Sequence, residues 1–327
     1  MDWFEHFIVP MPPKNPQPTL RCLYFMMTKL LPMVALFVSP FLLAKELAFS
    51  FDDGLNPDNN PAAKAINQRI LDQLDDQKVT AIVFPALVKT GRGGGLDLIA
   101  DWGKNGHKIG NHSEAHVSLN KADVTVAQYT TGIENAQTVL QTMAGWAPRY
   151  RFPFLKEGDT AEKRDGVRNW LQTHGYKAGD VTIDASDWYY NQLFKQYQEQ
   201  NDTVSQHKLK AAYIAHLLNR AHYYDALAVK TIGYSPKHVY LLHVNNINAA
   251  YLGDAIAALR KAGWNIIDSD QAYADPVYTT KTDNLPAGES LIWAIAKSKG
   301  EKRLRYPAED APYEKANLEQ HGIWVQP

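Results

Sequence analysis

Residues 47–54, Leu-Ala-Phe-Ser-Phe-Asp-Asp-Gly, form an apolar run that ends in two adjacent carboxylates and a glycine. Side chains of a β-strand alternate between two faces, so Asp52 and Asp53 can share one environment only where the strand ends and the chain turns. Gly54 permits that turn because it has no Cβ atom. The stretch therefore predicts a buried strand whose carboxyl end carries either a solvated turn or a metal or acid–base site.

The composition limits the class of protein. The chain has 327 residues, of which 45% are hydrophobic and 21% charged, with a formal net charge of -1. That length fits one large α/β domain of barrel size or two smaller domains. The near-neutral charge and the lack of a basic stretch indicate that nucleic acid is not the partner.

An apolar segment near the N-terminus, Leu30–Leu43, is shorter than the roughly 20 residues that a transmembrane helix needs, and two prolines interrupt it. It predicts a signal peptide at residues 27–44 and no stable membrane anchor. Residues 1–26 are rich in proline and unlike the start of a signal peptide, so we expect translation to begin at Met26 or Met27.

The cysteine content agrees with export. The sole cysteine, Cys22, precedes the predicted cleavage site, so a mature chain that starts at Lys45 contains none. Such a chain needs neither disulfides nor reduced thiols. We therefore expect a periplasmic or secreted bacterial protein.

From residue 45 onward, short β-rich runs alternate with helical patterns, which is typical of βαβ units and a parallel sheet. The predicted strands are Glu46–Phe51, Val79–Phe84, His107–Asn111, Arg149–Phe152, Tyr176–Ile183, His238–Val244 and Asn265–Ile267. The predicted helices are Pro61–Gln77, Leu96–Asn105, Ala122–Met143, Thr160–His174 and Ala249–Ala262. About seven such strands in one domain, residues 45–327, favour a barrel-like arrangement over an open sheet.

Two segments depart from this alternation. Residues 187–230 are polar and helical, and they predict a helical insertion in the domain. Residues 275–327 are rich in loops with one predicted helix at Glu289–Lys299, and we expect this C-terminal extension to wrap the outside of the barrel.

Further polar residues follow other predicted strands. His112 and His116 are four residues apart, a spacing that puts two imidazoles on one side of a helical turn, where they can share a metal. Arg151 can hold a neighbouring carboxylate ionised, although an ordinary surface arginine before a proline has the same pattern.

Asp184 and Asp187 follow a fourth strand, and His243 ends a fifth, very apolar one. His243 is either a core histidine bonded to the backbone or a proton donor whose pKa a nearby aspartate raises. The carboxyl ends of the strands in a parallel barrel converge on one face, where catalytic residues collect. The five strand ends together therefore predict one catalytic site.

The chain resembles the polysaccharide deacetylases, a carbohydrate esterase family that includes chitin, peptidoglycan and chitooligosaccharide deacetylases. The likeness extends from Leu47 to about Asp268. It rests on five motifs in the family's order: Ser50–Gly54, His112–His116, Arg151–Phe154, Asp184–Trp188 and Leu241–His243. Ser50 replaces the threonine that is usual in the family.

The resemblance implies a distorted (β/α) barrel and a divalent metal held by Asp53, His112 and His116. Two imidazoles and one carboxylate form a common catalytic zinc set, and Co²⁺ or Mn²⁺ can take the place of Zn²⁺. The resemblance also implies that Asp52 is the general base and that Arg151 holds it ionised.

For the remaining steps, the resemblance implies that His243 donates a proton to the leaving amine and that Asp187 keeps it protonated. It further implies that the backbone N–H of Phe154 stabilises the oxyanion, and that Trp188 and Leu241 line the pocket for the acetyl methyl group.

The implied function is metal-dependent hydrolysis of the acetamide C–N bond in an N-acetylated glycan, with a carbohydrate polymer or oligosaccharide as substrate. The same chemistry cleaves esters, so an O-acetyl esterase acting on xylan or another acetylated polymer is an alternative. A glycan-binding relative without catalysis is disfavoured because the full residue set is present, and a cytosolic amide hydrolase is disfavoured by the apolar segment. The long insertion is a candidate cap over the substrate groove.

Overall fold

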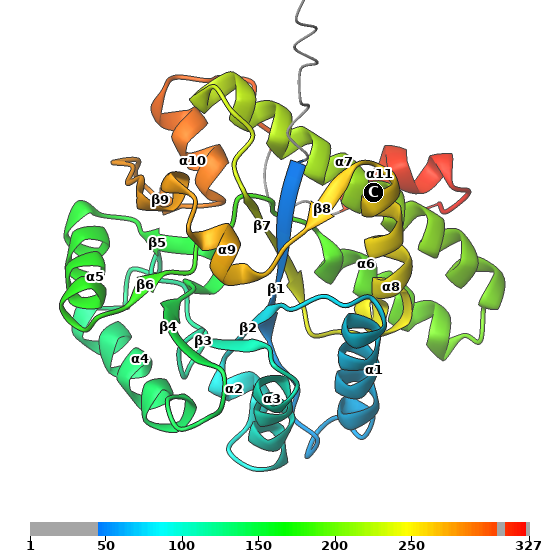
Figure 1. The fold of residues 1–327 in the computed structure, drawn as a ribbon, viewed down its shortest axis with the longest axis horizontal. Helices are drawn as coiled ribbons and strands as arrows, with labels where there is room; N and C mark the ends of the chain where they lie inside the picture. The colour runs from blue at the N-terminus through cyan, green and yellow to red at the C-terminus, as the bar shows by residue number, and fades with distance from the viewer. Residues whose placement is uncertain (1–44, 306–310, 325–327) are drawn as a thin grey trace, which may run out of the picture. The chain divides into compact units, whose positions relative to one another are not determined.

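The computed structural model describes residues 45–305 and 311–324. The apolar run that precedes Asp52 forms the central strand β1 (Lys45–Asp53), which is buried from Leu47 to Asp52. β1 pairs in parallel with β2 (Ile82–Pro85) on one side and with β7 (His238–His243) on the other, as Figure 1 shows. A parallel strand that is covered on both faces needs a nearly continuous apolar sequence, which this stretch supplies.

The sheet has seven strands, and all its pairings are parallel. The path from one edge to the other is β6-β4-β3-β2-β1-β7, and β8 pairs with the start of β1. The strands not yet placed are β3 (Lys108–Asn111), β4 (Trp146–Tyr150), β6 (Lys177–Ala178) and β8 (Trp264–Ile266).

The segment that follows β6 joins the two edges of this path. The predicted strand Tyr176–Ile183 is too long, because only Lys177–Ala178 pairs with β4. Ile183 then forms a parallel bridge to Tyr240 in β7, and Leu241 N–H donates to the Ile183 carbonyl at 2.9 Å. The same short stretch thus contacts both edges and closes the sheet, which confirms the predicted distorted barrel of about seven parallel strands.

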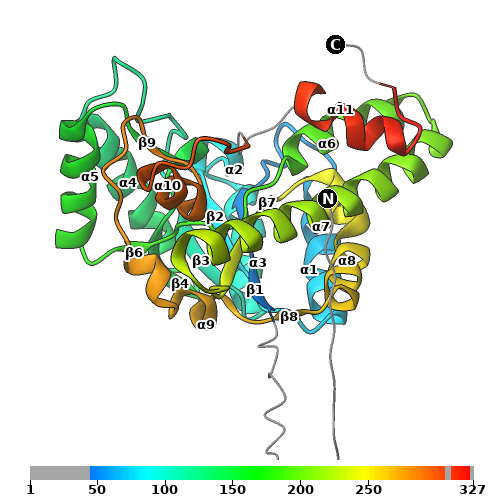
Figure 2. The ribbon, with the colours of Figure 1, turned by 90° about the horizontal axis from the view of Figure 1, so that it is seen from above.

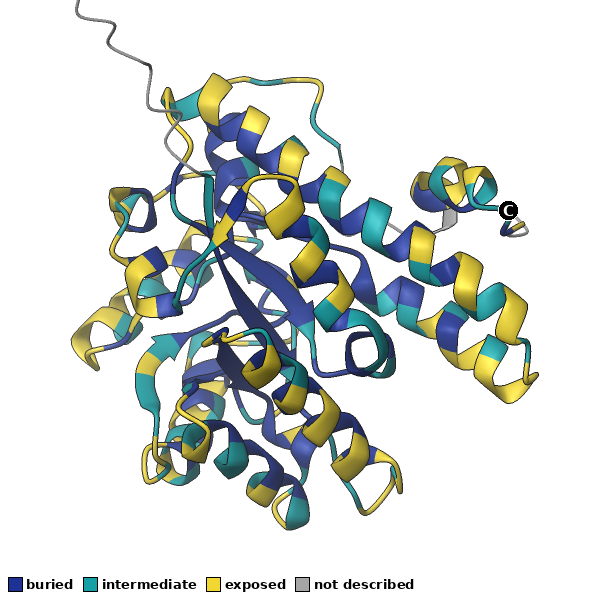
Figure 3. Ribbon diagram, turned by 45° about the vertical axis from the view of Figure 1, so that its right-hand side comes forward, coloured by how far each residue is buried: buried dark blue, intermediate teal, exposed yellow. Residues whose placement is uncertain are grey.

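Helices surround the barrel (Figure 1, Figure 2). Figure 3 shows the central strands almost wholly buried, while the surrounding helices alternate between buried and exposed positions. The helices up to the insertion and after it are α1 (Ala63–Asp76), α2 (Leu87–Thr90), α3 (Gly94–Lys104), α4 (Val126–Leu140), α5 (Ala161–Thr173), α8 (Asn246–Lys261) and α9 (Ser269–Tyr273). The predicted helices therefore all exist, with shifted ends.

Two of these ends differ for identifiable reasons. The helix predicted from Pro61 begins at Ala63, because the Asn60 side chain accepts from Ala62 N–H and forms a turn before it. The helix predicted from Ala122 starts only after Thr125, because Thr125 and Gln128 form a reciprocal capping box.

The insertion consists of two helices, α6 (Asp187–Glu199) and α7 (Thr203–Ile232), and α7 packs against α6, α8 and two C-terminal helices. The C-terminal segment contains η2 (Pro276–Thr279), β9 (Ala287–Gly288), α10 (Leu291–Ser298) and α11 (Ala311–Gln320). One helix was predicted there, and α11 was missed because its sequence has little amphipathic periodicity.

β9 pairs in antiparallel fashion with β5 (Lys156–Gly158), which follows the 3₁₀ turn η1 (Pro153–Leu155). The predicted N-terminal extension and signal peptide lie outside the described residues. Within the ranges that the structure describes, no helix combines the length and the apolar character needed to cross a membrane.

Candidate active site

The turn after β1 brings both aspartates to one cavity. Asp53 has a φ of 81°, and Gly54 N–H donates to the Asp52 carbonyl at 3.2 Å, so the chain reverses in a tight three-residue turn. A Cβ atom at position 54 would lie 2.6 Å from the Thr90 methyl group, at a φ of 94°. Asp52 is buried, which excludes the solvated turn as an interpretation of the motif.

The cavity at this turn has a volume of about 450 Å³. Nine of the residues singled out from the sequence line it: Asp52, Asp53, His112, His116, Phe154, Asp184, Trp188, Leu241 and His243. Arg151 and Asp187 do not line it but bond to residues that do. The strand ends therefore converge as the parallel barrel predicted. Of the insertion, Trp188 is the residue that reaches the cavity.

Three side chains in the cavity can hold a metal ion. One ligand atom from each of Asp53, His112 and His116 lies within 4.8 Å of the other two, and within the described part of the chain no other trio of His, Cys, Asp or Glu does so. Asp53 Oδ1 is buried without a hydrogen-bond partner and lies 3.3 Å from His116 Nε2. A buried carboxylate oxygen without a donor fits a bound cation.

The protonation of the trio suits this role. Burial lowers the pKa of both His112 and His116 to about 4, so both imidazoles are neutral at neutral pH. Burial alone would raise the pKa of Asp53, but His243, His116 and His112 outweigh it and lower the pKa. Neutral imidazoles and an ionised carboxylate are the forms that bind metal.

The segment from His112 to His116 is a loop, so the prediction of a helical turn is wrong. Ser113 N–H donates to Asn111 Oδ1 at 2.8 Å, and His116 N–H donates to Ser113 Oγ at 3.1 Å. Ser113 and His116 have φ values of 70° and 49°. Local side-chain bonds of this kind compete with helix formation.

His112 is oriented by the backbone of the next strand end. Its Nδ1 lies 2.8 Å from the Arg151 carbonyl, which can only accept, so Nδ1 carries the proton. Nε2 is then left with its lone pair as the ligand atom.

Asp52 and Arg151 form a buried ion pair. Arg151 Nη1 lies 2.8 Å from Asp52 Oδ1, and its other nitrogens donate to the Gly179 carbonyl and to Ser50 Oγ. Burial raises the pKa of Asp52, while Arg151 acts in the opposite direction. Asp52 is therefore a carboxylate with an above-normal proton affinity, which suits proton acceptance.

His243 is paired with a buried carboxylate. Its Nδ1 lies 2.7 Å from Asp187 Oδ1, while Asp187 Oδ2 accepts from His243 N–H and from two asparagine side chains, Asn245 and Asn248. Burial alone would lower the pKa of His243, but Asp187, with help from Asp53 and Asp52, raises it to about 10. His243 is thus not a core histidine bonded only to backbone.

The sequence did not single out several residues at the site. Asn245 caps α8 by accepting from Asn248 N–H, three residues later. An asparagine at this spacing before a helix is a common N-cap, so the sequence could have predicted this pair. Lys89, Lys156 and Glu289 line the cavity, but they belong to none of the five motifs and carried no local signal.

Backbone strain is concentrated at the cavity. Eight non-glycine residues in the described ranges have a positive φ, and five of them line the cavity: Asp53, His116, Phe154, Leu155 and Glu289. Such conformations persist only where the surroundings impose them, and they cluster at functional sites.

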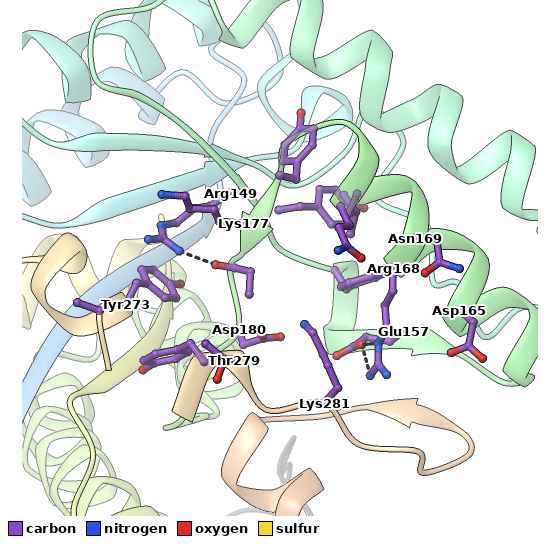
Figure 4. Close-up of a pocket in the computed structure, with 18 of the residues that line it drawn as sticks. Arg149, Glu157, Asp165, Arg168, Asn169, Lys177, Asp180, Tyr273, Thr279 and Lys281 are labelled. Atoms are coloured by element: carbon purple, nitrogen blue, oxygen red, sulfur yellow. Dashed lines mark hydrogen bonds and ion pairs between the residues drawn. The ribbon is translucent and has the colours of Figure 1, made fainter. Parts of the chain in front are cut away.

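A larger cavity, of about 1110 Å³, is lined by none of the three candidate metal ligands and by neither Asp52 nor His243 (Figure 4). Figure 4 shows charged side chains of both signs around it, and several already have partners. Arg168 bonds to Glu157 at 2.9 Å, and Arg149 donates to the Ala178 carbonyl while lying over the Tyr273 ring. The larger cavity therefore lacks a comparable group of catalytic side chains, and the smaller cavity is the better candidate for an active site.

Comparisons with known proteins agree with the motif resemblance. Residues 43–179 match the family model described as polysaccharide deacetylase. Two peptidoglycan-N-acetylglucosamine deacetylases of Bacillus cereus are 28% and 27% identical to the chain over 144 and 146 residues. Each match covers 44% of this chain and 46% or 48% of the relative, so the chain spans about half the length of the curated relatives it matches.

Solved structures with a similar fold include a peptidoglycan deacetylase of Bacillus subtilis, with 19% identity and a TM-score of 0.47, covering 71% of this chain and 91% of that one. A family 4 carbohydrate esterase of Bacillus subtilis has 22% identity and a TM-score of 0.47, with 71% and 81% covered. The resemblance that the motifs predicted is confirmed by the match of residues 43–179 to the polysaccharide deacetylase family model.

Proposed function

We propose that the protein is a metal-dependent hydrolase that removes acetyl groups from an N-acetylated glycan such as peptidoglycan or a chitin-like polymer. One observation carries this proposal: a metal-ligand trio, an arginine-held carboxylate and a carboxylate-held histidine all meet at one cavity. These are the parts that acyl-group hydrolysis needs, namely an electrophile, a base and an acid.

Asp53, His112 and His116 hold the metal in this proposal, with Zn²⁺ as the first choice and Co²⁺ or Mn²⁺ as alternatives. A divalent cation bound there supplies Lewis acidity, which makes a water molecule more acidic and polarises the acetyl carbonyl.

Asp52 accepts the proton of the attacking water through Oδ2. Its Oδ1 is occupied by Arg151 at 2.8 Å, whereas Oδ2 lies on the side of His112 Nε2, 3.6 Å away. Arg151 fixes the orientation of the carboxylate and keeps it ionised until the proton arrives.

His243 delivers a proton from Nε2 to the leaving nitrogen, because Asp187 holds Nδ1. Its raised pKa keeps the imidazolium form present at neutral pH. The backbone N–H of Phe154 stabilises the oxyanion, and Trp188 and Leu241 enclose the acetyl methyl group. Secretion by way of the signal peptide at residues 27–44 would bring the enzyme to its polymer.

The test is acetate release from peptidoglycan, chitooligosaccharides and acetylxylan by the wild type, by Asp52→Asn and by chelated enzyme to which metal is returned. We expect Asp52→Asn and chelation to abolish release without unfolding the protein, and metal to restore it. Lys281→Ala, in the larger cavity, is the matched control and should be fully active.

Acetate release from acetylxylan alone would show that the protein is an O-acetyl esterase and not an N-deacetylase. Undiminished release after both Asp52→Asn and chelation would overturn the mechanism, and binding of glycan without any acetate release would favour a non-catalytic relative.

A further inference from the structure

A lysine–glutamate pair forms part of the cavity wall and is used by none of the steps above. Lys156 and Glu289 are ion-paired, and both line the cavity that holds the metal-ligand trio. Their side chains are 22% and 15% exposed, so the pair lies at the cavity surface rather than in the core. Glu289 lies beyond residues 43–179, outside the part of the chain that matches the family model.

The pair is placed by the small β5–β9 sheet. Glu289 N–H donates to the Leu155 carbonyl at 2.8 Å, and Lys156 is the register partner of Gly288. A Cβ atom at Gly288 would lie 1.9 Å from the Leu155 oxygen, so this close approach requires glycine.

The backbone around the pair is strained. Phe154, Leu155 and Glu289 have φ values of 58°, 55° and 74°. Such conformations persist only where the surrounding contacts impose them, and they cluster at functional sites. The contacts of the β5–β9 sheet therefore hold the pair in a fixed position at the cavity, which suits a role in binding.

The chemistry of the pair fits hydroxyl groups. Glu289 accepts from Lys156 through Oε1, and among the described residues no side chain or backbone N–H donates to its Oε2, so Oε2 can accept from a ligand. A lysine donor next to a carboxylate acceptor can bind two neighbouring hydroxyls of a sugar ring.

The surroundings suit a sugar ring. Phe154, 57% exposed and 4.5 Å from the His116 ring, adds an apolar ring on which the face of a sugar can lie.

We propose that Lys156 and Glu289 are the specificity-determining residues of a subsite that binds the hydroxyl groups of an N-acetylated sugar. This inference rests on the proposed function, since the same cavity must hold the acetyl group of that sugar.

The test compares two substrates in wild type, Glu289→Gln and Lys156→Met: a chitooligosaccharide, and 4-nitrophenyl acetate, which has the acetyl group but no sugar. We expect KM for the chitooligosaccharide to rise about tenfold with kcat nearly unchanged, as for a lost hydrogen bond to a charged group. Hydrolysis of 4-nitrophenyl acetate should stay within about twofold of wild type, because the ester makes no contact with the pair.

A matched control is Glu301→Gln, since Glu301 forms a similar ion pair with Lys230 away from the cavity. This variant should hydrolyse both substrates with wild-type kinetic constants. Calorimetric binding of the chitooligosaccharide to Asp52→Asn, with and without Glu289→Gln, measures the same loss without turnover, and thermal unfolding reports whether each variant folds.

An unchanged KM in both variants, with an active wild type, overturns the subsite and leaves the proposed function standing. An equal loss of activity on the ester and on the oligosaccharide also overturns the subsite, because the pair would then affect the catalytic residues and not the sugar. A wild type that cleaves the ester but no glycan overturns the proposed function, and the subsite with it.

Discussion

Asp187→Asn tests the assignment of His243 as an acid. The substitution keeps the shape of a fully buried residue. The amide oxygen can take the place of Oδ2, where it still accepts from His243 N–H, Asn245 and Asn248, so we expect the fold to persist. The amide nitrogen then faces His243 Nδ1, and the charge that holds the imidazolium is gone.

The magnitude follows from the pKa of His243. With a pKa of about 10, the imidazole is almost wholly protonated at about pH 8. If the pKa returns to its ordinary value of 6.5, only about 3% carries the proton at that pH, a fall in kcat of about 30-fold. In the variant, burial still acts to lower this pKa while Asp53 and Asp52 still act to raise it, so the ordinary value is the reference for the expected fall. At about pH 6, about three quarters would be protonated, and most of the activity should return.

The assay is kcat for acetate release between about pH 5 and pH 10, with thermal unfolding of both proteins. His112 and His116, with pKa values of about 4, remain neutral over this range, so loss of the metal ligands does not disturb the comparison. We expect the alkaline limb to move from about pH 10 to pH 6.5 or below. An activity loss that is the same at every pH would refute the role of His243 as the acid.

Three other substitutions probe the rest of the cavity. Arg151→Met leaves the buried Asp52 carboxylate without its ion-pair partner. Acetate release should fall at least about 100-fold, and the free energy of unfolding, measured by denaturant titration, should fall by about 3–5 kcal/mol. Near-wild-type values for both would contradict the role of the ion pair. Burial raises the pKa of Asp184 from 3.8 to about 7, so its contribution to stability is full below about pH 3.8 and is lost as the pH rises through 7. Asp184→Asn should therefore remove a decline of at most about 4 kcal/mol from the curve of unfolding free energy against pH. An unchanged curve would argue against a raised pKa of Asp184. Trp188→Ala should widen the acetyl pocket and raise the rate on 4-nitrophenyl propionate relative to the acetate, and an unchanged ratio would place Trp188 outside that pocket.

Sequence patterns predicted the barrel and most of the cavity because those features are local. The buried run before Asp52 specifies a parallel strand, and a polar residue directly after such a strand must lie at the carboxyl edge of the sheet. The loop from His112 to His116 was misjudged, since a spacing of four is equally compatible with a helical turn and with a loop tied by Asn111 and Ser113.

Lys156 and Glu289 could not be predicted for a different reason. They are 133 residues apart and meet through two very short strands, which have no periodicity to recognise. The strained φ angles next to them are likewise imposed by tertiary contacts, and leave no mark on the sequence except Gly288. Long-range pairing of short segments is the part of this fold that a single sequence does not encode locally.

The positions of the proposed base and acid are set by the sheet itself. Asp52 and His243 are register partners on the adjacent strands β1 and β7, and Val244 N–H donates to the Asp52 carbonyl at 3.2 Å. Backbone pairing therefore fixes their separation at one inter-strand step, about 5 Å, whatever their side chains contact. The proposed metal ligands His112 and His116 instead lie on a loop, and the pair Lys156–Glu289 lies at the small second sheet. Substitutions in those segments can change the metal or the sugar without moving the acid relative to the base, whereas a shift in the β1–β7 register would displace both groups at once.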